Sequence, residues 1–460
     1  MINNLIHSML VCPDYDRAYP SITHAEGIYL IDKNGKKYID ATSGTAAVSN
    51  LGHSIPGISD VVKEQMDAVA LIPTHTFTSE QVEGYLARLI DFAPEGFNRA
   101  WTATSGTEAV EQSLKLALQY HQLRGEGHRY KIISRWGTYH GNSVFTLDVG
   151  GMALRRAVYD KWMNNFPHIP PSYSYRRPDG MSEEEYAVIS AGELEKCLLE
   201  TGPESVAAFI AEPMVAAALG GVGPSEGYFK EVRRVCDKYG ILFIADEILT
   251  GFGRIGANFG MERFGVTPDI IAAGKGISGG YFPLSAVIAH QKVTAIFEEK
   301  KIPFLGGHSF ACNPVGAAIG SFVIDYMKEN KVVENSLKMG EVFLEKLQRI
   351  YRHDMVGDVR GMGLYLGVEF VADRETKLPF AKELNISRKI VDKVFEKGVV
   401  VYLGKGSYDG TSGDHITISP PLIINEEQIE IIVQAIDESI EEVSRNLQTK
   451  NTKETASIKI

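Results

Sequence analysis

Residues 240–256, which read GILFIADEILTGFGRIG, indicate the fold of this chain of 460 residues. Ile241–Ala245 is an apolar run of strand length that ends at two adjacent acids. Runs of the same kind occur at Lys131–Ser134 and Val206–Ile210, with helical patterns between them. Because apolar strands that alternate with helices form parallel sheets covered on both faces, the sequence predicts an α/β fold.

The two ends of the chain have a different pattern. Residues 27–40 alternate around Asn34-Gly35, a strong turn signal, and therefore predict a hairpin. Towards the C-terminus, amphipathic helices are predicted at 322–350, 384–397 and 425–446, and strands at 364–370, 398–403 and 415–418. We therefore expect four regions: an N-terminal segment whose hairpin joins the small domain (1–56), a large domain (57–320), a smaller α+β domain (321–446) and a frayed polar tail (447–460).

The composition excludes several classes of protein. The chain has 47 basic and 58 acidic residues, a net charge of −11, and no basic stripe for a nucleic-acid backbone. Its apolar stretches are too short to span a membrane, and we expect no secretory signal. The four cysteines are scattered without a CxxC pair. This argues against a disulfide framework or a metal site and agrees with a reducing cytoplasm.

Asp246 and Glu247 come where the apolar run ends. Ligands of open α/β sheets bind at the carboxyl ends of the strands, and a buried carboxylate needs a partner there. Because neighbouring side chains on a strand point to opposite faces, at most one of the two acids enters a given pocket. The alternatives are an ion pair or a metal ligand, and no histidine or further acid lies at ligand spacing.

Lys275 lies between two glycines, directly after the apolar segment DIIAA at 269–273. A lysine held among apolar groups tends to lose its proton and can then attack a carbonyl carbon. The alternative is an ordinary lysine in a surface loop.

Ser105-Gly106-Thr107 precedes a predicted helix over 105–119. Free backbone N–H groups, the positive end of the helix dipole, two hydroxyls and a glycine together favour an anion site. The alternative is a plain helix N-cap, with Glu108 in the first turn.

Gly251–Gly256 (GFGRIG) matches the GxGxxG pattern of dinucleotide-binding proteins. That fingerprint requires its glycines directly after a strand and at the start of a helix. Here Asp246–Thr250 intervene, and the following ANFGMERFG is a poor helix. We therefore expect no nicotinamide site at this motif.

The ordered set of motifs resembles the class III (ω-type) aminotransferases, which use pyridoxal 5'-phosphate (PLP). The resemblance covers most of the chain, from GIYLIDKNGKKYIDATSG at 27–44 to ISPPLIINEEQIEIIV at 418–433. Between them lie SGTEAVEQSLKLA, SRWGTYHGN, FIAEP and PDIIAAGKGISGG. It implies PLP fold type I, that of aspartate aminotransferase, with a large domain around a mostly parallel sheet and a smaller α+β domain.

The resemblance also implies roles for single residues. Lys275 matches the lysine bonded to the cofactor, and Asp246 matches the acid paired with its pyridine nitrogen. Tyr139 matches the aromatic residue on one face of the cofactor ring, and Ile248 the branched residue on the other. Ser309, where the family usually has threonine, matches a phosphate ligand donated by the neighbouring subunit. The other positions expected to bind the cofactor are Ser105, Gly106, Thr107, His140 and Glu212.

The implied activity is amino transfer from an amine or ω-amino acid to a 2-oxo acid, pyruvate for example, by a ping-pong mechanism. A PLP-dependent racemase, epimerase or aminomutase is the alternative, because it would share the lysine, the aspartate and the phosphate site. The expected partners are the two small substrates and a second copy of the chain, in a homodimer or a dimer of dimers with composite active sites. We expect no nucleic-acid or membrane partner.

Two features depart from the family pattern. Many members bind a substrate carboxylate through an arginine shortly before the C-terminal PPL motif, but no arginine occurs between Arg388 and Arg445. Ala217 stands where members specialised for glutamate-like substrates have a switching glutamate. We infer that this enzyme is not an ornithine- or GABA-type transaminase using that switch.

Thr45–Ala47 indicates either a roomier substrate pocket or simple packing against the sheet. The candidates for another carboxylate clamp are Arg155, Arg156, Arg176 and Lys405.

Overall fold

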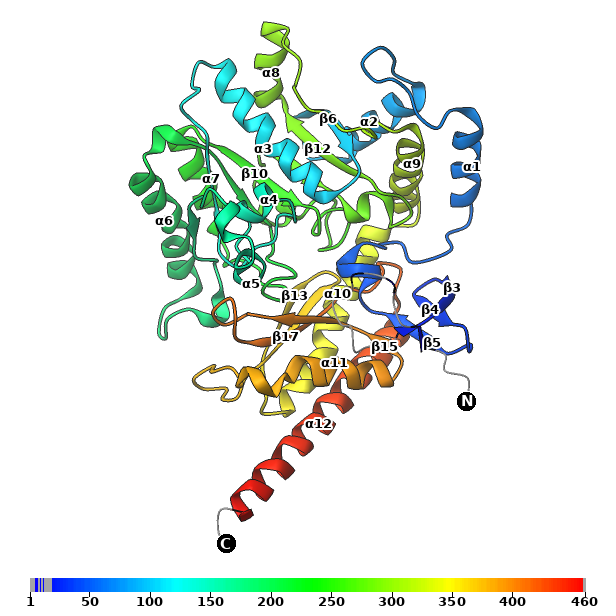
Figure 1. Ribbon diagram of the computed structural model, residues 1–460, viewed down its shortest axis with the longest axis vertical. Coiled ribbons are helices and arrows are strands. Elements are labelled where there is room, and N and C mark those ends of the chain that lie inside the picture. Colours follow the sequence, from blue (N-terminus) through cyan, green and yellow to red (C-terminus); the bar gives the residue numbers. More distant parts are fainter. Residues whose placement is uncertain (1–4, 7–8, 10, 12–18, 458–460) are drawn as a thin grey trace.

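Figure 1 shows the computed structural model, which describes residues 5–6, 9, 11 and 19–457. Its central element is a seven-stranded sheet. In spatial order, the strands are β6 (Phe97–Ala103), β12 (Ser285–His290), β11 (Ile270–Ala273), β10 (Leu242–Glu247), β9 (Val206–Ala211), β7 (Lys131–Arg135) and β8 (His168–Ile169). β12 runs antiparallel to β11 and β6, and the other neighbouring pairs are parallel. The predicted α/β fold with a mostly parallel sheet is therefore confirmed.

Helices cover both faces of this sheet. The helices of this region are α1 (Ile58–Ala68), α2 (Glu80–Phe92), α3 (Gly106–Leu123), α4 (Val144–Val149), α5 (Ala153–Arg156), α6 (Glu183–Thr201), α7 (Tyr228–Tyr239), α8 (Gln291–Lys300) and α9 (Pro314–Glu329). Of these, α1 packs on α9 and α5 on α4. Phe209 and Phe243 belong to the core under α6 and α7, whereas Ala208 and Ile244 belong to the core under α3. Alternate residues of β9 and β10 thus face opposite layers, so these strands are apolar throughout.

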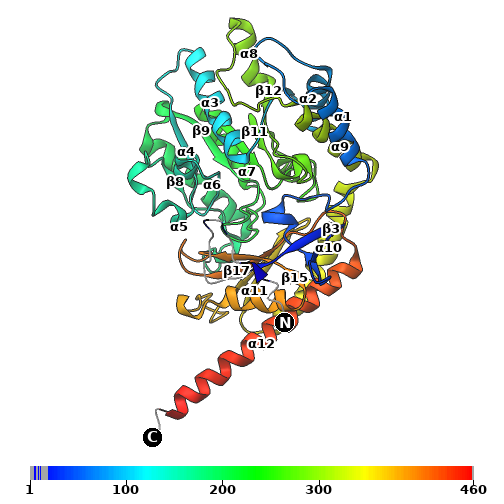
Figure 2. The same ribbon diagram turned by 45° about the vertical axis from the view of Figure 1, so that its right-hand side comes forward.

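Two smaller sheets lie beside this layer. The chain after α9 forms α10 (Val332–Leu347), α11 (Ile386–Glu396), α12 (Glu426–Ser457) and an antiparallel sheet of β13 (Val356–Met362), β14 (Tyr365–Phe370), β17 (Asp414–Ile418) and β16 (Tyr402–Lys405). The predicted hairpin is β4 (Tyr29–Asp32) and β5 (Lys37–Asp40), flanked by β3 (Ile22–Glu26) and by β15 (Val399–Val400). β15 pairs parallel with β5, so the N-terminal hairpin lies against the C-terminal region, as Figure 2 shows. A further short pair is β1 (Leu5–Ile6) with β2 (Tyr19–Pro20).

Several predicted bounds were wrong. The single helix expected at 322–350 is two helices, α9 and α10, because Lys331 between them has a left-handed backbone (φ 50°). The single strand expected at 398–403 is divided at Val401 between two different sheets. Residues 447–457, expected to fray, continue α12 to Ser457. Strand β13 was not predicted.

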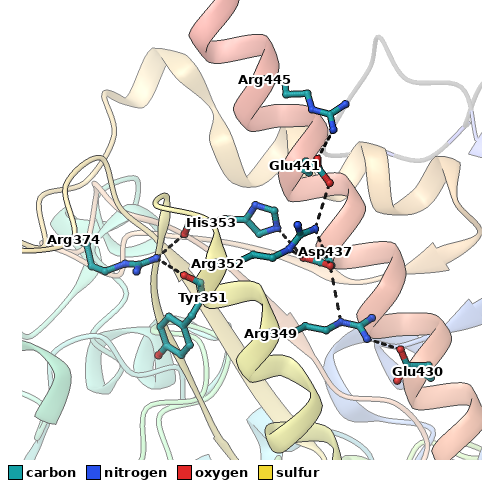
Figure 3. A network of polar contacts seen from close by, with 9 residues as sticks. All are labelled: Arg349, Tyr351, Arg352, His353, Arg374, Glu430, Asp437, Glu441 and Arg445. Carbon is teal, nitrogen blue, oxygen red and sulfur yellow. Dashed lines mark hydrogen bonds and ion pairs between the residues drawn. The ribbon is translucent and has the colours of Figure 1, made fainter.

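Helix α12 projects beyond the rest of the molecule in both ribbon views and is held at its base by ionic contacts (Figures 1 and 2). Figure 3 shows the network that joins it to the turn before β13. Asp437 accepts hydrogen bonds from Arg352 Nε at 3.1 Å and from His353 Nε2 at 2.7 Å. Arg349 pairs with Glu430, two turns earlier in the helix. Beneath these contacts lies an apolar stripe at helical spacing: Ile429, Ile432, Val433, Ile436 and Ile440 are buried.

The described part of the chain has neither a membrane-spanning helix nor a cluster of metal-ligating side chains. None of its helices is both long and apolar enough to cross a membrane. None of its histidine, cysteine, aspartate and glutamate side chains form a group of three or more that could hold a metal ion.

Candidate active site

A cavity of about 200 Å³ opens at the carboxyl ends of β9, β10 and β11, beside the N-terminus of α3. It is lined by Gly106, Thr107, Tyr139, His140, Gly141, Glu212, Ala217, Asp246, Ile248, Leu249 and Lys275. Eight of the ten predicted site residues are in this lining, and only Ser105 and Ser309 are not. Larger hollows of about 490 Å³ and 600 Å³ elsewhere contain no comparable set of lysine, histidine and carboxylates.

Asp246 and Glu247, the last two residues of β10, face opposite sides of the sheet, which confirms the prediction that only one of them enters the pocket. Asp246 is 4% exposed, and its Oδ2 lies 2.7 Å from Nδ1 of His140. Its Oδ1 accepts a hydrogen bond from the backbone N–H of Ile248 at 3.1 Å. These contacts hold the carboxylate in one orientation in the cavity.

Glu247 is bound on the far side by groups of the protein itself. Its carboxylate accepts hydrogen bonds from the Thr250 hydroxyl and from the backbone N–H groups of Gly260 and Met261, the last two at 2.7 and 2.8 Å. Burial raises the pKa of Glu247 to about 7. Since its acceptor oxygens are occupied within the fold, this residue has a structural task.

Lys275 is separated from β11 by Gly274 alone and begins a short 3₁₀ turn, Lys275–Ser278. Its backbone is left-handed, with φ 47°, a conformation that costs energy for a residue with a side chain. Removal from solvent lowers the pKa of Lys275 to about 8, although the nearby carboxylates Glu212 and Asp246 oppose this shift. About a tenth of the amine is therefore unprotonated at pH 7, far more than for an ordinary lysine, in the direction that the sequence predicts for a lysine among apolar groups.

Glu212 comes directly after β9 and fixes the backbone that carries Tyr139. Its Oε1 accepts from the N–H of Tyr139 at 3.0 Å, and its Oε2 accepts from the N–H of Ala216 at 3.1 Å. Burial raises the pKa of Glu212 above its ordinary value. The backbone that carries the Tyr139 ring is therefore fixed at the cavity wall.

The N-terminus of α3 closes another side of the cavity. Ser105 is the N-cap: its Oγ accepts from the N–H of Glu108 at 3.3 Å, and the Glu108 carboxylate accepts from the N–H of Ser105 at 3.2 Å. The capping alternative therefore applies to Ser105, while Gly106 and Thr107 line the cavity. A Cβ added at Gly106 would lie only 2.9 Å from Cγ2 of Ile248, so the helix can approach the strand this closely only with glycine there.

Ser309 lies in the exposed segment that precedes α9, outside the cavity of its own chain. Thr45–Ala47 also lies outside the lining. Ala47 is fully buried in a cluster with Met214, and Thr45 is exposed. The packing interpretation therefore fits Ala47, and the structure gives no support for a pocket enlarged by this segment.

The GxGxxG motif forms a loop rather than a strand-to-helix junction. Phe252 N–H donates to the carbonyl of Asn258 at 2.7 Å, and Gly253 N–H donates to that of Ala257 at 3.1 Å, so the chain doubles back on itself. The motif therefore lacks the geometry of a dinucleotide site.

Arg254, within this loop, is a residue that the sequence analysis missed. It is fully buried, and its guanidinium donates to the carbonyls of Leu364 and Pro420 at 2.9 and 2.6 Å. It also donates to Oγ of Ser43 at 3.1 Å and to Oδ1 of Asn50 at 2.6 Å. Burial lowers the pKa of Arg254 to about 9, and its charge contributes to the lowered pKa of Lys275. The only signal in the sequence was a lone arginine among glycine and apolar residues.

The four cations predicted as alternatives for a carboxylate clamp differ in the partners that their side chains bind. Arg156 Nη1 donates to three carbonyls, at 3.0 Å to Leu147, at 2.8 Å to Gly150, and to Asp148. Arg176 forms an ion pair with Glu369. Lys405 donates to Oδ1 of Asn385 at 2.6 Å and lines a separate surface hollow. Arg155 lies over Tyr139, with its guanidinium carbon 5.0 Å from the ring centroid.

Comparison with known proteins identifies this architecture. A solved transaminase from the marine bacterium Virgibacillus superposes with a TM-score of 0.89 at 33% identity, covering 96% of this chain and 97% of that one. An uncharacterized aminotransferase of Schizosaccharomyces pombe is 40% identical over 92% of both chains. The putrescine–pyruvate aminotransferase of Pseudomonas aeruginosa is 32% identical over 90% of this chain and 88% of that protein.

The fold and these relatives define a transaminase of PLP fold type I. Residues 11–440 match the family model described as aminotransferase class-III, and the chain belongs to that family. Members are PLP-dependent enzymes that transfer an amino group from an amine to a 2-oxo acid, and this chain is such a transaminase. Because these relatives are aminotransferases, the racemase, epimerase or aminomutase alternative is not favoured.

Proposed function

We propose that the cavity binds PLP through the residues described above and carries out amino transfer there. The observation that carries this proposal is that Lys275, with a pKa lowered to about 8, shares one small cavity with the buried Asp246–His140 pair. PLP needs an amine to hold it covalently and an acid beside its ring nitrogen, and when bound it supplies an electron sink for the bond that breaks at the substrate carbon.

The remaining lining fits the rest of the cofactor. Tyr139 supplies an aromatic face and Ile248 an aliphatic one, which together match a flat ring between them. Gly106 and Thr107, at the start of the long helix α3, bring backbone N–H groups and a hydroxyl to the same cavity, which suits a phosphate. We assign Ser105 an indirect part, because its hydroxyl caps the helix.

Each reacting residue then has a definite task. Asp246, oriented by His140 and the Ile248 N–H, keeps a proton on the ring nitrogen. With PLP bound, Lys275 would hold it covalently, and once freed by the incoming amine its unprotonated amino group would carry the proton from the substrate carbon to the cofactor. Glu212 keeps the Tyr139 backbone in place, so the ring above the cofactor stays aligned.

We further propose pyruvate as an acceptor and a donor range that extends to amines without a carboxylate. Two observations support this breadth. Ala217 lines the cavity where a switching glutamate would stand in glutamate-specific members, and a relative acts on putrescine and pyruvate according to its name. The distinguishing measurement is a matrix of donors against acceptors on the pure protein. Selective turnover of ornithine or GABA with 2-oxoglutarate would contradict the proposal.

We infer that the active unit is a homodimer. Ser309 is exposed beside Leu305 and Phe310, whose side chains are 75% and 57% exposed. Apolar side chains gathered in this way favour a covered surface, and a second copy would bring Ser309 to the phosphate end of the other cavity. Light scattering should give the mass of a dimer or a tetramer, and a monomeric active enzyme would contradict the inference.

We also propose a reducing compartment such as the cytoplasm, which the free Cys197, Cys236 and Cys312 support.

The decisive test uses an amine donor without any acceptor. Protein loaded with PLP should convert its cofactor to the amino form in one stoichiometric step that is seen by absorbance, and added pyruvate should reverse it. Protein that stays colourless after incubation with PLP, or borohydride that labels a peptide without Lys275, would refute the proposed site.

A further inference from the structure

A transaminase of this class must bind a carboxylate in every cycle, because its acceptor is a 2-oxo acid. A buried or half-buried carboxylate needs a cation or several hydrogen-bond donors. Lys275 is already committed to the reaction, and the family's usual arginine before the PPL motif is missing. The first group to look for is therefore another cation near the cavity whose hydrogen-bond donors are not already used by the protein.

Most arginines near the site are already occupied by the protein. Arg135 donates to the carbonyl of Glu212. Arg254 donates four hydrogen bonds from its two Nη atoms to carbonyl and side-chain oxygens in the interior. Arg176 and Arg360 share the carboxylate of Glu369, and Arg360 also pairs with Asp358 at 2.7 Å. Recruiting any of these would leave a buried acceptor or acid without its partner, at a cost of several kcal/mol.

Arg155 differs from all of them. It is exposed on α5, and among the described residues its side chain has no ion pair and no hydrogen bond. Its guanidinium lies over the ring of Tyr139, which itself lines the cavity. Its charge acts on that ring, because it lowers the pKa of Tyr139 against the larger, raising effect of burial.

The neighbouring residue explains why Arg155 points this way. Arg156 is buried and anchored to the carbonyls of Leu147, Asp148 and Gly150, so the short helix α5 is fixed to the end of α4. The preceding side chain is rotated from Arg156 by about 100° around the helix axis and lies over the ring of Tyr139. The cation is thus positioned in advance while its hydrogen-bond donors remain free.

We propose that Arg155 is the specificity-determining residue that binds the carboxylate of the 2-oxo acid acceptor and of amino-acid donors at the mouth of the cavity beside Tyr139. This inference rests on the proposed function of the cavity. A guanidinium that stays stacked on an aromatic ring keeps its N–H edge available for two parallel hydrogen bonds to a carboxylate. Amines without a carboxylate can enter the same cavity without this contact.

The test compares Arg155→Met, which keeps a long side chain over Tyr139 without charge, and Arg155→Lys, which keeps the charge without the flat fork. Arg445→Met is the matched control, because Arg445 is an exposed arginine on α12 whose pair with Glu441 is remote from the cavity. Two quantities are measured on the PLP-loaded enzyme. One is the dissociation constant of propionate, by calorimetry; the other is the ratio of kcat/KM for L-alanine to that for isopropylamine.

We expect Arg155→Met to weaken propionate binding by about 10- to 100-fold and to lower the kcat/KM ratio by a similar factor, with Arg155→Lys in between. Arg445→Met should match the unmodified protein in both quantities. Unchanged propionate binding in Arg155→Met, or an equal loss for both donors, would overturn the inference and leave Arg155 as a support for the Tyr139 ring. Failure of the proposed function would look different, because the unmodified protein itself would then transfer no amino group from either donor.

Discussion

Asp246 and Arg155 both act electrostatically on Tyr139, but the molecule holds them in opposite ways. Asp246 is 4% exposed at the end of a central strand, and both of its oxygens have fixed partners, His140 and the Ile248 N–H. Arg155 is exposed on a helix of four residues and has no hydrogen-bond partner among the described side chains. The acid that we propose serves every substrate is thus fixed by the sheet, whereas the cation that we propose selects substrates has its hydrogen-bond donors available to them.

Among the buried residues of the cavity, replacing Lys275 should cause the largest loss of activity. In Lys275→Ala, both the covalent link to the cofactor and the base are lost, so kcat/KM should fall by about 10⁴-fold or more. Steady-state kinetics and borohydride labelling measure this. Lys63→Ala, at an exposed lysine paired with Asp67, serves as the control. A Lys275→Ala protein that still becomes covalently labelled would show that another amine holds the cofactor.

Asp246→Asn should have the next largest effect, because it keeps the shape and removes the charge. We expect kcat to fall by about 10²- to 10³-fold, the range for losing one preorganised electrostatic contact. The adjacent Glu247→Gln is a stringent control, since that side chain faces away from the cavity. An amide there would oppose one N–H donor with another, so it should cost about 1–3 kcal/mol of unfolding free energy with little loss of activity. Equal losses of kcat in Asp246→Asn and Glu247→Gln would contradict the assignment of only Asp246 to the cavity.

The pH dependence of cofactor uptake should report the burial of Lys275. Only the neutral amine bonds with PLP, so a pKa lowered to about 8 means that the rate should rise about tenfold per pH unit below pH 8 and level off above it. Stopped-flow absorbance on cofactor-free protein measures this rate. Asp246→Asn should move the midpoint lower, because the Asp246 charge raises the pKa of Lys275. A rate that climbs steadily to pH 10 would contradict the buried environment.

His140→Ala should have the smallest effect. The Asp246 carboxylate would lose its contact with Nδ1 but keep the Ile248 N–H. One charge-assisted hydrogen bond is worth about 1.5 kcal/mol, so we expect a loss of about tenfold in kcat. A shift in the absorption maximum of the bound cofactor would accompany it, because the charge beside the ring nitrogen becomes less well fixed. No shift and no loss would assign His140 a purely structural part.

Much of this buried side could be predicted from the sequence because its signals are local. The apolar run before Asp246, the cap before α3 and the glycines around Lys275 each depend on a few neighbouring residues. Parallel topology then brings these strand ends to one edge, and eight predicted residues meet in one cavity. Ser105 shows the limit of such signals, since the same motif fits a cap and an anion site.

The features that the sequence missed or left undecided depend on distant partners or on the direction of a side chain. Arg155 and Arg156 are identical in type, and only the anchoring of α5 decides which of them turns inward. The break at Val401 arises because β15 pairs with a hairpin encoded near the start of the chain, which no local pattern reveals. The partners of Arg254 are equally remote in sequence, so its glycine and apolar neighbours alone could not show what its guanidinium binds.

The hydrogen bonds of Arg254 also constrain the order in which the parts of the chain can fold. Its four acceptors lie 110, 166, 204 and 211 positions away along the chain, before it and after it. During synthesis, the loop that carries this cation cannot settle into its final place until Pro420 has been made and has docked, since a guanidinium without acceptors would not stay out of water. In a fragment that ends before Pro420, the loop Gly251–Gly256 near Lys275 should therefore not reach its final packing.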